Sequence, residues 1–271
     1  MKRMAVLLLA LVASVGCTAT ARPRVPVGAP SADRLVEFTD PESMTRLSRS
    51  DYKIDFFHLA VQFESQTNKA FCGPTSATIV LNALRAANDR IEKPQDASLV
   101  PAGVRQRLGG AFDPLYHRYT QYDVFNAEAA AVKTPAEVLG APRTPGAKPD
   151  PGLQLRQLQA LLAANGVAST LRIVDDALAD ETIRAELKTN LASADDYVIV
   201  NYTRAALGQE GGGHISPLGA YDEASDSFLI LDVNPNGHTW VWAPAAMLIH
   251  AMRTTDGTEN RGYLLVKEGT P

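Results

Sequence analysis

The sequence is poor in cysteine, in excess positive charge and in long apolar runs, and each shortage excludes a class of protein. Two cysteines among 271 residues cannot build a disulfide framework or a zinc site made of thiolates. Lysine and arginine number 26 against 30 aspartates and glutamates, which argues against nucleic acid as the main partner. The glycine patterns of dinucleotide-binding and P-loop proteins are absent. What remains is an ordinary globular composition, with 45% hydrophobic and 21% charged residues.

The N-terminus has the features of a secretory signal. A basic start precedes an apolar run from Met4 to Ala13, which is shorter than the about 20 residues that a membrane span needs. Cleavage before Cys17 would give a lipoprotein, and cleavage after Ala21 would give an ordinary exported protein. We favour lipidation of Cys17, because it directly follows the apolar run. The sequence thus predicts a periplasmic protein whose signal segment is 1–21, held to a membrane only through a lipid anchor.

The rest of the chain divides into a tether and one catalytic domain. Residues 22–41 are rich in proline, serine and charge and predict a tether, and 42–271 predict a single domain. Apolar residues at three- and four-residue spacing predict helices from about Cys72, from about Leu153 and through Ile183, Leu187 and Leu191, the last with Asp180 as its cap. Short β-branched or aromatic runs in the last third predict strands at 171–174, 197–202, 214–221, 228–233 and 262–266. Helices followed by strands indicate an α+β protein with a mainly antiparallel sheet.

Cys72 is the first candidate for chemistry. Once Cys17 is lipidated or removed, Cys72 is the only free thiol, and an unpaired cysteine in an exported protein indicates reactivity. It lies at the predicted start of a helix, where the free N–H groups and partial positive charge favour the thiolate. The same N–H groups can hold an oxyanion.

A base and an orienting carboxylate follow from the predicted hairpin. Among the five histidines, His214 is distinct because it opens a strand directly after three glycines ending at Gly213, where backbone can approach a substrate closely. A turn of three residues after Tyr221 would place Asp232 opposite His214, and a turn of five would leave the two as diagonal neighbours on one face. An odd shift in register would separate them onto opposite faces.

These residues stand in segments that resemble a known family. QTNKAFCGPTSATIVLNAL, GQEGGGHISPLGAYDEASDSFLILDVN and RGYLLV are similar to the phytochelatin synthase family, a branch of the papain-like cysteine peptidases, in its short bacterial form. The resemblance implies a papain-like fold, with Cys72 on a helical lobe and His214 and Asp232 on the sheet. Residues 94–119 and 133–151 look like insertions relative to that family.

The resemblance also implies a role for each site residue. Cys72 is the nucleophile, His214 the general base and acid, and Asp232 the carboxylate that orients it. Gln66 matches the glutamine of the oxyanion hole. Arg261 is expected to anchor a substrate carboxylate, with Gly213 beside it in the substrate-binding site.

The implied substrate is glutathione. Cleavage of its Cys–Gly amide through a thioester on the enzyme would give γ-Glu-Cys by hydrolysis, or a phytochelatin by transfer to a second glutathione. No cofactor is obligatory, and no dedicated metal site is expected. A Cd or Zn ion would enter as a metal–thiolate form of the substrate. The sequence does not distinguish a monomer from a homodimer.

Two alternatives remain at this point. A bacteriocin-processing type of cysteine peptidase shares the Cys-Gly-Pro helix start and the same order of site residues, and it would cut peptides after Gly-Gly. A lipid-anchored protein that binds thiol–metal complexes without turnover would need neither His214 nor Asp232.

Overall fold

The computed structural model describes residues 34–108, 113–237 and 239–269. The predicted signal segment, Cys17 and the first part of the predicted tether lie outside these residues. The end of the tether region does not, because Val36 is fully buried in a strand and a helix begins at Pro41. The folded part of the chain therefore starts before residue 42.

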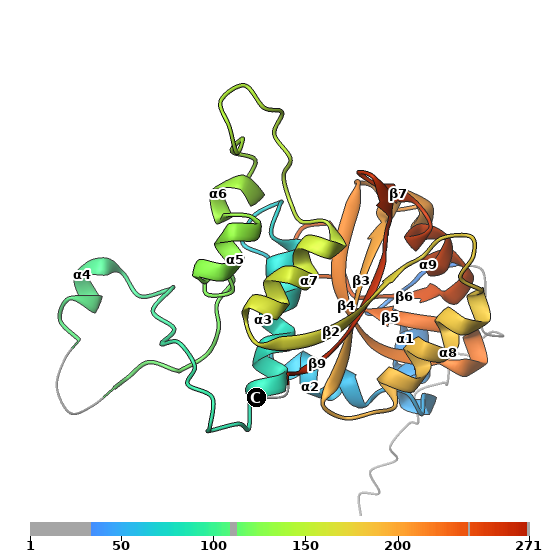
Figure 1. Ribbon diagram of the computed structural model, residues 1–271. Coiled ribbons are helices and arrows are strands. Elements are labelled where there is room, and N and C mark those ends of the chain that lie inside the picture. The colour runs from blue at the N-terminus through green and yellow to red at the C-terminus, as the bar shows by residue number, and fades with distance from the viewer. Residues whose placement is uncertain (1–33, 109–112, 238, 270–271) are drawn as a thin grey trace, which may run out of the picture.

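After the short strand β1, seven α-helices of the described residues precede the remaining strands, and two further α-helices stand among those strands (Figure 1). The helices are α1 (Pro41–Arg49), α2 (Ile54–Val61), α3 (Cys72–Arg85), α4 (Ala102–Arg105), α5 (Ala127–Val132), α6 (Pro135–Val138), α7 (Leu155–Ala164), α8 (Asp180–Leu191) and α9 (Ala245–Met252). The strands are β1 (Val36–Glu37), β2 (Val167–Ile173), β3 (Asp196–Thr203), β4 (Gly213–Asp222), β5 (Ser227–Ile230), β6 (Val241–Pro244), β7 (Thr255–Asp256), β8 (Glu259–Asn260) and β9 (Gly262–Glu268).

One antiparallel sheet forms the centre of the described residues. Its strands run in the order β1-β6-β5-β4-β3-β9-β2, and β7 and β8 form a separate short hairpin. The helices α3 and α7 pack on one face of the sheet, and α8 and α9 pack on the other (Figure 1). The predicted α+β class with a mainly antiparallel sheet is confirmed, and its arrangement is compatible with a papain-like fold.

The two faces of the sheet are set by alternation along its central strands. In β3, Tyr197 and Ile199 enter the core that faces α3 and α7, whereas Val198 and Val200 enter the core that faces α8 and α9. A strand buried on both faces therefore reads as a continuous apolar run, as β3 does in the sequence. Because β3 is packed on both faces, it holds its neighbour β4, which carries His214, in a fixed position.

Most predicted elements are present, with shifted ends. The helix expected near Cys72 begins at that residue, and Asp180 is the first residue of α8 rather than its cap, which is Ala179. The predicted strand 171–174 starts earlier, at Val167. The predicted strand 228–233 ends at Ile230, so Asp232 lies beyond it. The helix α2 and the strand β6 were missed.

The turn between β4 and β5 also differs from both predicted lengths. Asp222 pairs with Ser227, so four residues make the connection, and that length alone would put His214 and Asp232 on opposite faces. The ladder skips Gly219, because Leu218 pairs with Ile230 while Ala220 pairs with Leu229. This β-bulge adds one residue to β4 and brings Asp232 back to the side of His214.

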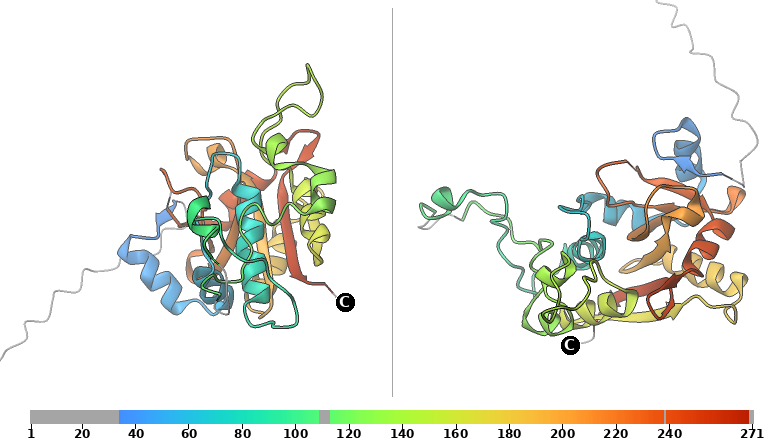
Figure 2. Two further views of the ribbon diagram at one scale, coloured as in Figure 1. Left: turned by 90° about the vertical axis from the view of Figure 1, so that its left-hand side faces the viewer. Right: turned by 90° about the horizontal axis from the view of Figure 1, so that it is seen from above.

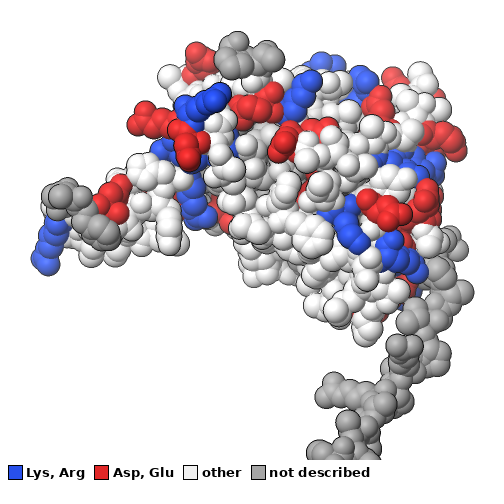
Figure 3. Space-filling view, turned by 90° about the horizontal axis from the view of Figure 1, so that it is seen from below, with Lys and Arg blue, Asp and Glu red and all other residues white. Residues whose placement is uncertain are grey.

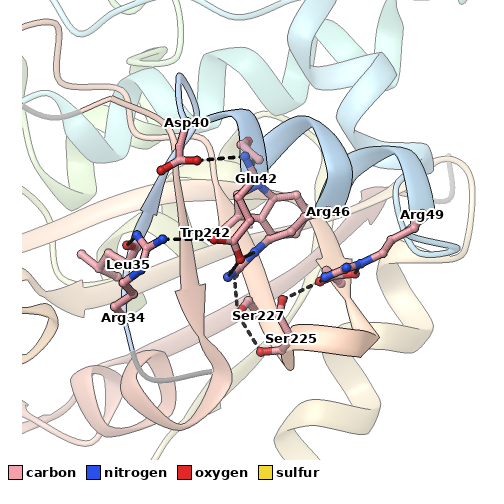
Figure 4. Close-up of polar contacts among 11 residues, drawn as sticks. Arg34, Leu35, Asp40, Glu42, Arg46, Arg49, Ser225, Ser227 and Trp242 are labelled. Atoms are coloured by element: carbon pink, nitrogen blue, oxygen red, sulfur yellow. Dashed lines mark hydrogen bonds and ion pairs between the residues drawn. The ribbon is translucent and has the colours of Figure 1, made fainter. Parts of the chain in front are cut away.

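The helix α1 is held on the sheet by buried polar contacts (Figure 4). Asp40 caps its first turn by accepting from the N–H of Glu42 at 2.8 Å. The fully buried Arg46 donates to Ser227 Oγ at 3.0 Å, and Trp242 Nε1 donates to Ser43 Oγ at 2.9 Å. These contacts join the beginning of the domain to β5 and β6. The strand β5 lies beside β4, which carries His214.

The segment between α3 and α5 extends away from the body of the molecule. Figure 2 shows α4 at the far end of this projection. On the lower face, acidic and basic side chains lie interspersed around an uncharged central area (Figure 3). No helix within the described ranges is long and apolar enough to cross a membrane.

Candidate active site

Cys72 is the first residue of α3, and the hydroxyl of Ser76 ties this end of the helix to the sheet. Ser76 Oγ lies 2.8 Å from the carbonyl oxygen of Cys72 and 3.1 Å from that of Ile215 on β4. Gly73 allows the close approach, since a Cβ there would lie 3.2 Å from Leu153. The thiol is partly exposed, at the point where the helix start meets the strand.

His214 is the second residue of β4 and faces the thiol. It pairs with Tyr202 on β3, whose ring meets the imidazole edge to face at a centroid distance of 5.8 Å. The imidazole is buried, and it hydrogen-bonds with Cys72. Its Nε2 lies 3.0 Å from Oδ1 of Asp232, so Nδ1 is the nitrogen left for the thiol.

Asp232 stands just past the end of β5, buried and held by several donors. Arg204 Nη1 lies 2.7 Å from Oδ2 and Nη2 lies 3.0 Å from Oδ1. The N–H of Asn234 donates to Oδ1 at 2.8 Å, and the hydroxyl of Tyr202 lies 3.4 Å from Oδ2. The predicted trio of Cys72, His214 and Asp232 is therefore assembled, but the sequence argument missed Arg204.

Charges in this trio favour a thiolate beside an imidazolium. Burial alone would raise the pKa of Cys72, but the hydrogen bond and charge of His214 outweigh burial and lower that pKa below its ordinary value. Burial would lower the pKa of His214, yet Asp232 and the thiolate raise it. Burial opposes ionisation of Asp232 as well, and His214 together with Arg204 holds its pKa well below the ordinary range. The trio thus shifts Cys72 toward its thiolate form.

Gln66 is buried in the loop that leads to α3. Its backbone N–H donates to the carbonyl of Val233 at 2.8 Å, which ties this loop to the residue after Asp232. Its side-chain Nε2 donates to the carbonyl of Asn68 at 2.7 Å, and its Oε1 is buried without a partner in the described structure. An amide nitrogen carries two hydrogens, so Nε2 keeps one N–H for an oxyanion.

One groove beside Cys72 contains an ion pair. Its volume is about 390 Å³, and both Arg261 and Gly213 line it. Arg261 Nη1 lies 3.1 Å from Oδ2 of Asp256, and Asn201 Nδ2 donates to the same oxygen at 2.8 Å. Gly213 makes room for the guanidinium, because a Cβ there would lie 2.8 Å from Arg261 Nη1. Asp256 and Asn201 were missed from sequence, since only the fold brings the β7–β8 hairpin to β3.

A second groove opens on the other side of His214. Its volume is about 460 Å³, and it shares Lys69, Gly213 and His214 with the first groove. Gln66 and Arg204 also line it. His214 therefore lines both grooves, whereas Cys72 lines only the first.

The remaining site predictions concern a metal ion and the lipidated cysteine. Within the described residues, no group of three or more histidines, cysteines, aspartates or glutamates is placed to hold a metal ion. Cys17, the predicted lipidation site, lies outside the described residues.

Comparison with known proteins gives one family. The family model described as phytochelatin synthase matches residues 29–97 and 108–263. The stretch between the two matched parts lies within the segment 94–119 that the sequence argument set apart as an insertion.

The curated relatives carry a single activity in their names. A protein of Lotus japonicus named glutathione gamma-glutamylcysteinyltransferase 3 is 26% identical over 79% of this chain and 37% of its own length. A glutathione gamma-glutamylcysteinyltransferase of Schizosaccharomyces pombe is 24% identical, over 79% of this chain and 43% of its own. One of Triticum aestivum is 29% identical over 78% and 35%. The chain spans less than half the length of these relatives.

Proposed function

Because this chain belongs to the phytochelatin synthase family, we propose that it is a thiol enzyme that cleaves the Cys–Gly amide of glutathione. The observation that carries the proposal is the Cys72–His214–Asp232 trio, which opens into a groove with the Arg261–Asp256 pair. The names of the relatives agree with this substrate. The product is then γ-Glu-Cys or a phytochelatin, according to the acceptor.

The charged pair in the first groove suits the γ-glutamyl end of glutathione. That end carries an α-ammonium and an α-carboxylate on one carbon, the two charges of a free amino acid. Asp256 and the amide oxygen of Asn201 engage Nη1 of Arg261, which leaves Nη2 for the carboxylate, and Asp256 suits the ammonium. An ordinary peptide bears no such zwitterion in its interior, so this wall favours glutathione over the peptide of a bacteriocin-processing enzyme.

Acylation follows from the trio. The Cys72 thiolate attacks the carbonyl carbon of the Cys–Gly amide, and the oxyanion accepts from the N–H of Cys72 and the free N–H of Gln66. His214 then gives its proton to the glycine nitrogen as the C–N bond breaks. Glycine leaves, and γ-Glu-Cys remains as a thioester on Cys72.

Deacylation decides between hydrolase and transferase. Water, or the α-amine of a second glutathione, loses a proton to His214 and attacks the thioester carbon, which frees the thiolate. The second groove gives the glycine a way out and the acceptor a way in. A Cd or Zn ion enters this scheme as a thiolate complex of glutathione, as substrate rather than as a resident cofactor.

Export of the protein is part of the proposal. We propose that residues 1–21 direct it to the periplasm and that Cys17 carries a lipid. The mass of the mature protein from membranes, compared with that of Cys17→Ser, tests this directly. A wild-type mass equal to that of a chain starting at Thr18 or later, with no added lipid, would contradict it.

The decisive experiment incubates the mature protein with glutathione, with and without Cd²⁺. Mass spectrometry then follows glycine, γ-Glu-Cys and (γ-Glu-Cys)₂-Gly, with Cys72→Ser as the control. We expect glycine release from the wild type alone. A second substrate, glutaryl-Cys-Gly, keeps the carboxylate but lacks the ammonium, and its kcat/KM should fall by about 10- to 100-fold. Cleavage of a Gly-Gly peptide without glycine release from glutathione would sink the proposal.

A further inference from the structure

The segment after α6 forms one wall of the groove that holds Cys72. Leu139 follows the last residue of α6 and lines this groove with Pro151 and Leu153. Leu139 is 50% exposed, and it lines the same groove as the Cys72 thiol. An apolar side chain that stays exposed inside a binding groove indicates a contact with an apolar part of a ligand.

Leu139 is fixed in place. The N–H of Gly152 donates to the carbonyl of Val138 at 2.9 Å and closes the neck of the loop, and Val138 is fully buried. The buried Lys133 pairs with Asp150 at 2.8 Å, which holds the two ends of the segment together a second time. The wall is therefore built before a ligand binds.

The two sides of the groove differ in chemistry. Asn201, Asp256 and Arg261 make a polar side, whereas Leu139, Pro151 and Leu153 are apolar. The volume of about 390 Å³ falls within the ordinary range of ligand pockets, about 300–1,000 Å³. An occupant should therefore combine a zwitterionic end with an apolar group on its other side.

We propose that Leu139 is a specificity-determining residue that contacts whatever group the substrate carries on its cysteine sulfur. The inference rests on the proposed function. With the γ-glutamyl zwitterion on Arg261 and Asp256 and the acyl carbon at Cys72, the cysteine side chain branches off the chain between these two points and needs no polar partner. Leu139 then receives it, and its open side leaves room for an apolar group bonded to that sulfur.

The test compares glutathione with S-hexylglutathione as substrates for glycine release. The wild type should release glycine from both. Leu139→Asp should lower the ratio of kcat/KM for S-hexylglutathione to kcat/KM for glutathione roughly 10-fold or more. Leu139→Ala should shift the same ratio in the same direction, by about 3-fold. Leu99→Asp is the matched control, because Leu99 is 90% exposed and does not line the groove.

Each other outcome overturns the inference. A ratio of the two kcat/KM values that Leu139→Asp leaves unchanged, or that Leu99→Asp changes equally, would show that Leu139 does not contact the sulfur substituent. Wild type that releases glycine from glutathione but none from S-hexylglutathione would show that the wall does not receive such a group. No release from glutathione itself would instead overturn the proposed function, and this inference with it.

Discussion

Arg204 holds both carboxylate oxygens of Asp232, with Nη1 2.7 Å from Oδ2 and Nη2 3.0 Å from Oδ1, and both side chains are buried. A carboxylate gripped by two parallel bonds cannot turn. Asp232 therefore presents Oδ1 to His214 in one orientation, although it lies outside any strand.

We expect Arg204→Met to damage both activity and stability. It leaves the buried Asp232 charge with less compensation, which should lower the free energy of unfolding by about 3–5 kcal/mol. The carboxylate loses its fixed orientation, and kcat should fall about 10- to 100-fold. Without the neighbouring cation, Asp232 stabilises the imidazolium more strongly, so the pKa of His214 should rise and move the alkaline limb of the pH–rate profile upward.

The matched control is Arg184→Met. Arg184 also contacts both oxygens of an aspartate, Asp226, at 2.9 and 3.2 Å, but Asp226 is exposed and lies outside both grooves. Its loss should cost less than about 1 kcal/mol and leave the pH–rate profile unchanged. Equal pH–rate profiles for Arg204→Met and wild type would mean that Arg204 only supports the fold.

Removal of the imidazole should raise the pKa of Cys72. In wild type, iodoacetamide should alkylate the thiol with a midpoint below the value of about 8.5 for ordinary cysteine. In His214→Ala, burial is opposed only by the backbone bonds from Ile215 and Gly73, so the midpoint should move upward. Since Cys72 is the only cysteine among the described residues, its alkylation can be read from the intact mass. An unchanged midpoint would refute the ion pair.

Gly213→Ala should weaken substrate binding without touching the thiol. The new Cβ would lie 2.8 Å from Arg261 Nη1, so the guanidinium must leave its place beside Asp256. We expect KM for glutathione to rise about 10-fold or more, with the alkylation midpoint of Cys72 unchanged. At Gly212 a Cβ would meet nothing within 4 Å, so Gly212→Ala is the control. A KM equal to that of wild type in Gly213→Ala would remove Arg261 from the binding site.

Asp55 on α2 makes stability depend on pH. It is fully buried, neither of its oxygens has a partner in the described structure, and burial together with Asp196 raises its pKa to about 9. The unfolded chain releases this proton near pH 4, so the folded state binds one more proton between about pH 4 and 9. Stability should therefore fall as pH rises through this interval.

Asp55→Asn should remove that dependence. At pH 8 the amide should raise the free energy of unfolding by about 1–3 kcal/mol, because no buried charge or proton uptake is needed. Near pH 4 the two proteins should differ little. Urea unfolding at both pH values measures the difference, and parallel curves for variant and wild type would contradict the burial of an uncompensated carboxyl group.

How far the sequence predicts this molecule depends on how local each signal is. The helix start at Cys72 and the double-buried strand β3 are local patterns, and both are present. No local pattern indicated Asp256 or Arg204. Asp256 bonds with Asn201, which is distant in the chain, and Arg204 pairs with Asp232, which lies beyond the end of a strand. Helix α2 was missed since Ile54, Phe57 and Val61 lie on its exposed side and hide the usual amphipathic pattern.

The bulge at Gly219 has a consequence for how such enzymes can diverge. Side chains alternate along a strand, so an insertion or deletion of one residue between His214 and Asp232 turns the aspartate away, unless a second change of one residue accompanies it. Homologues can therefore gain or lose residues in this hairpin two at a time, whereas the gain or loss of a single residue would give an inactive enzyme. Whether the number of residues between His214 and Asp232 is odd or even should therefore be kept more strictly than the amino acids at those positions.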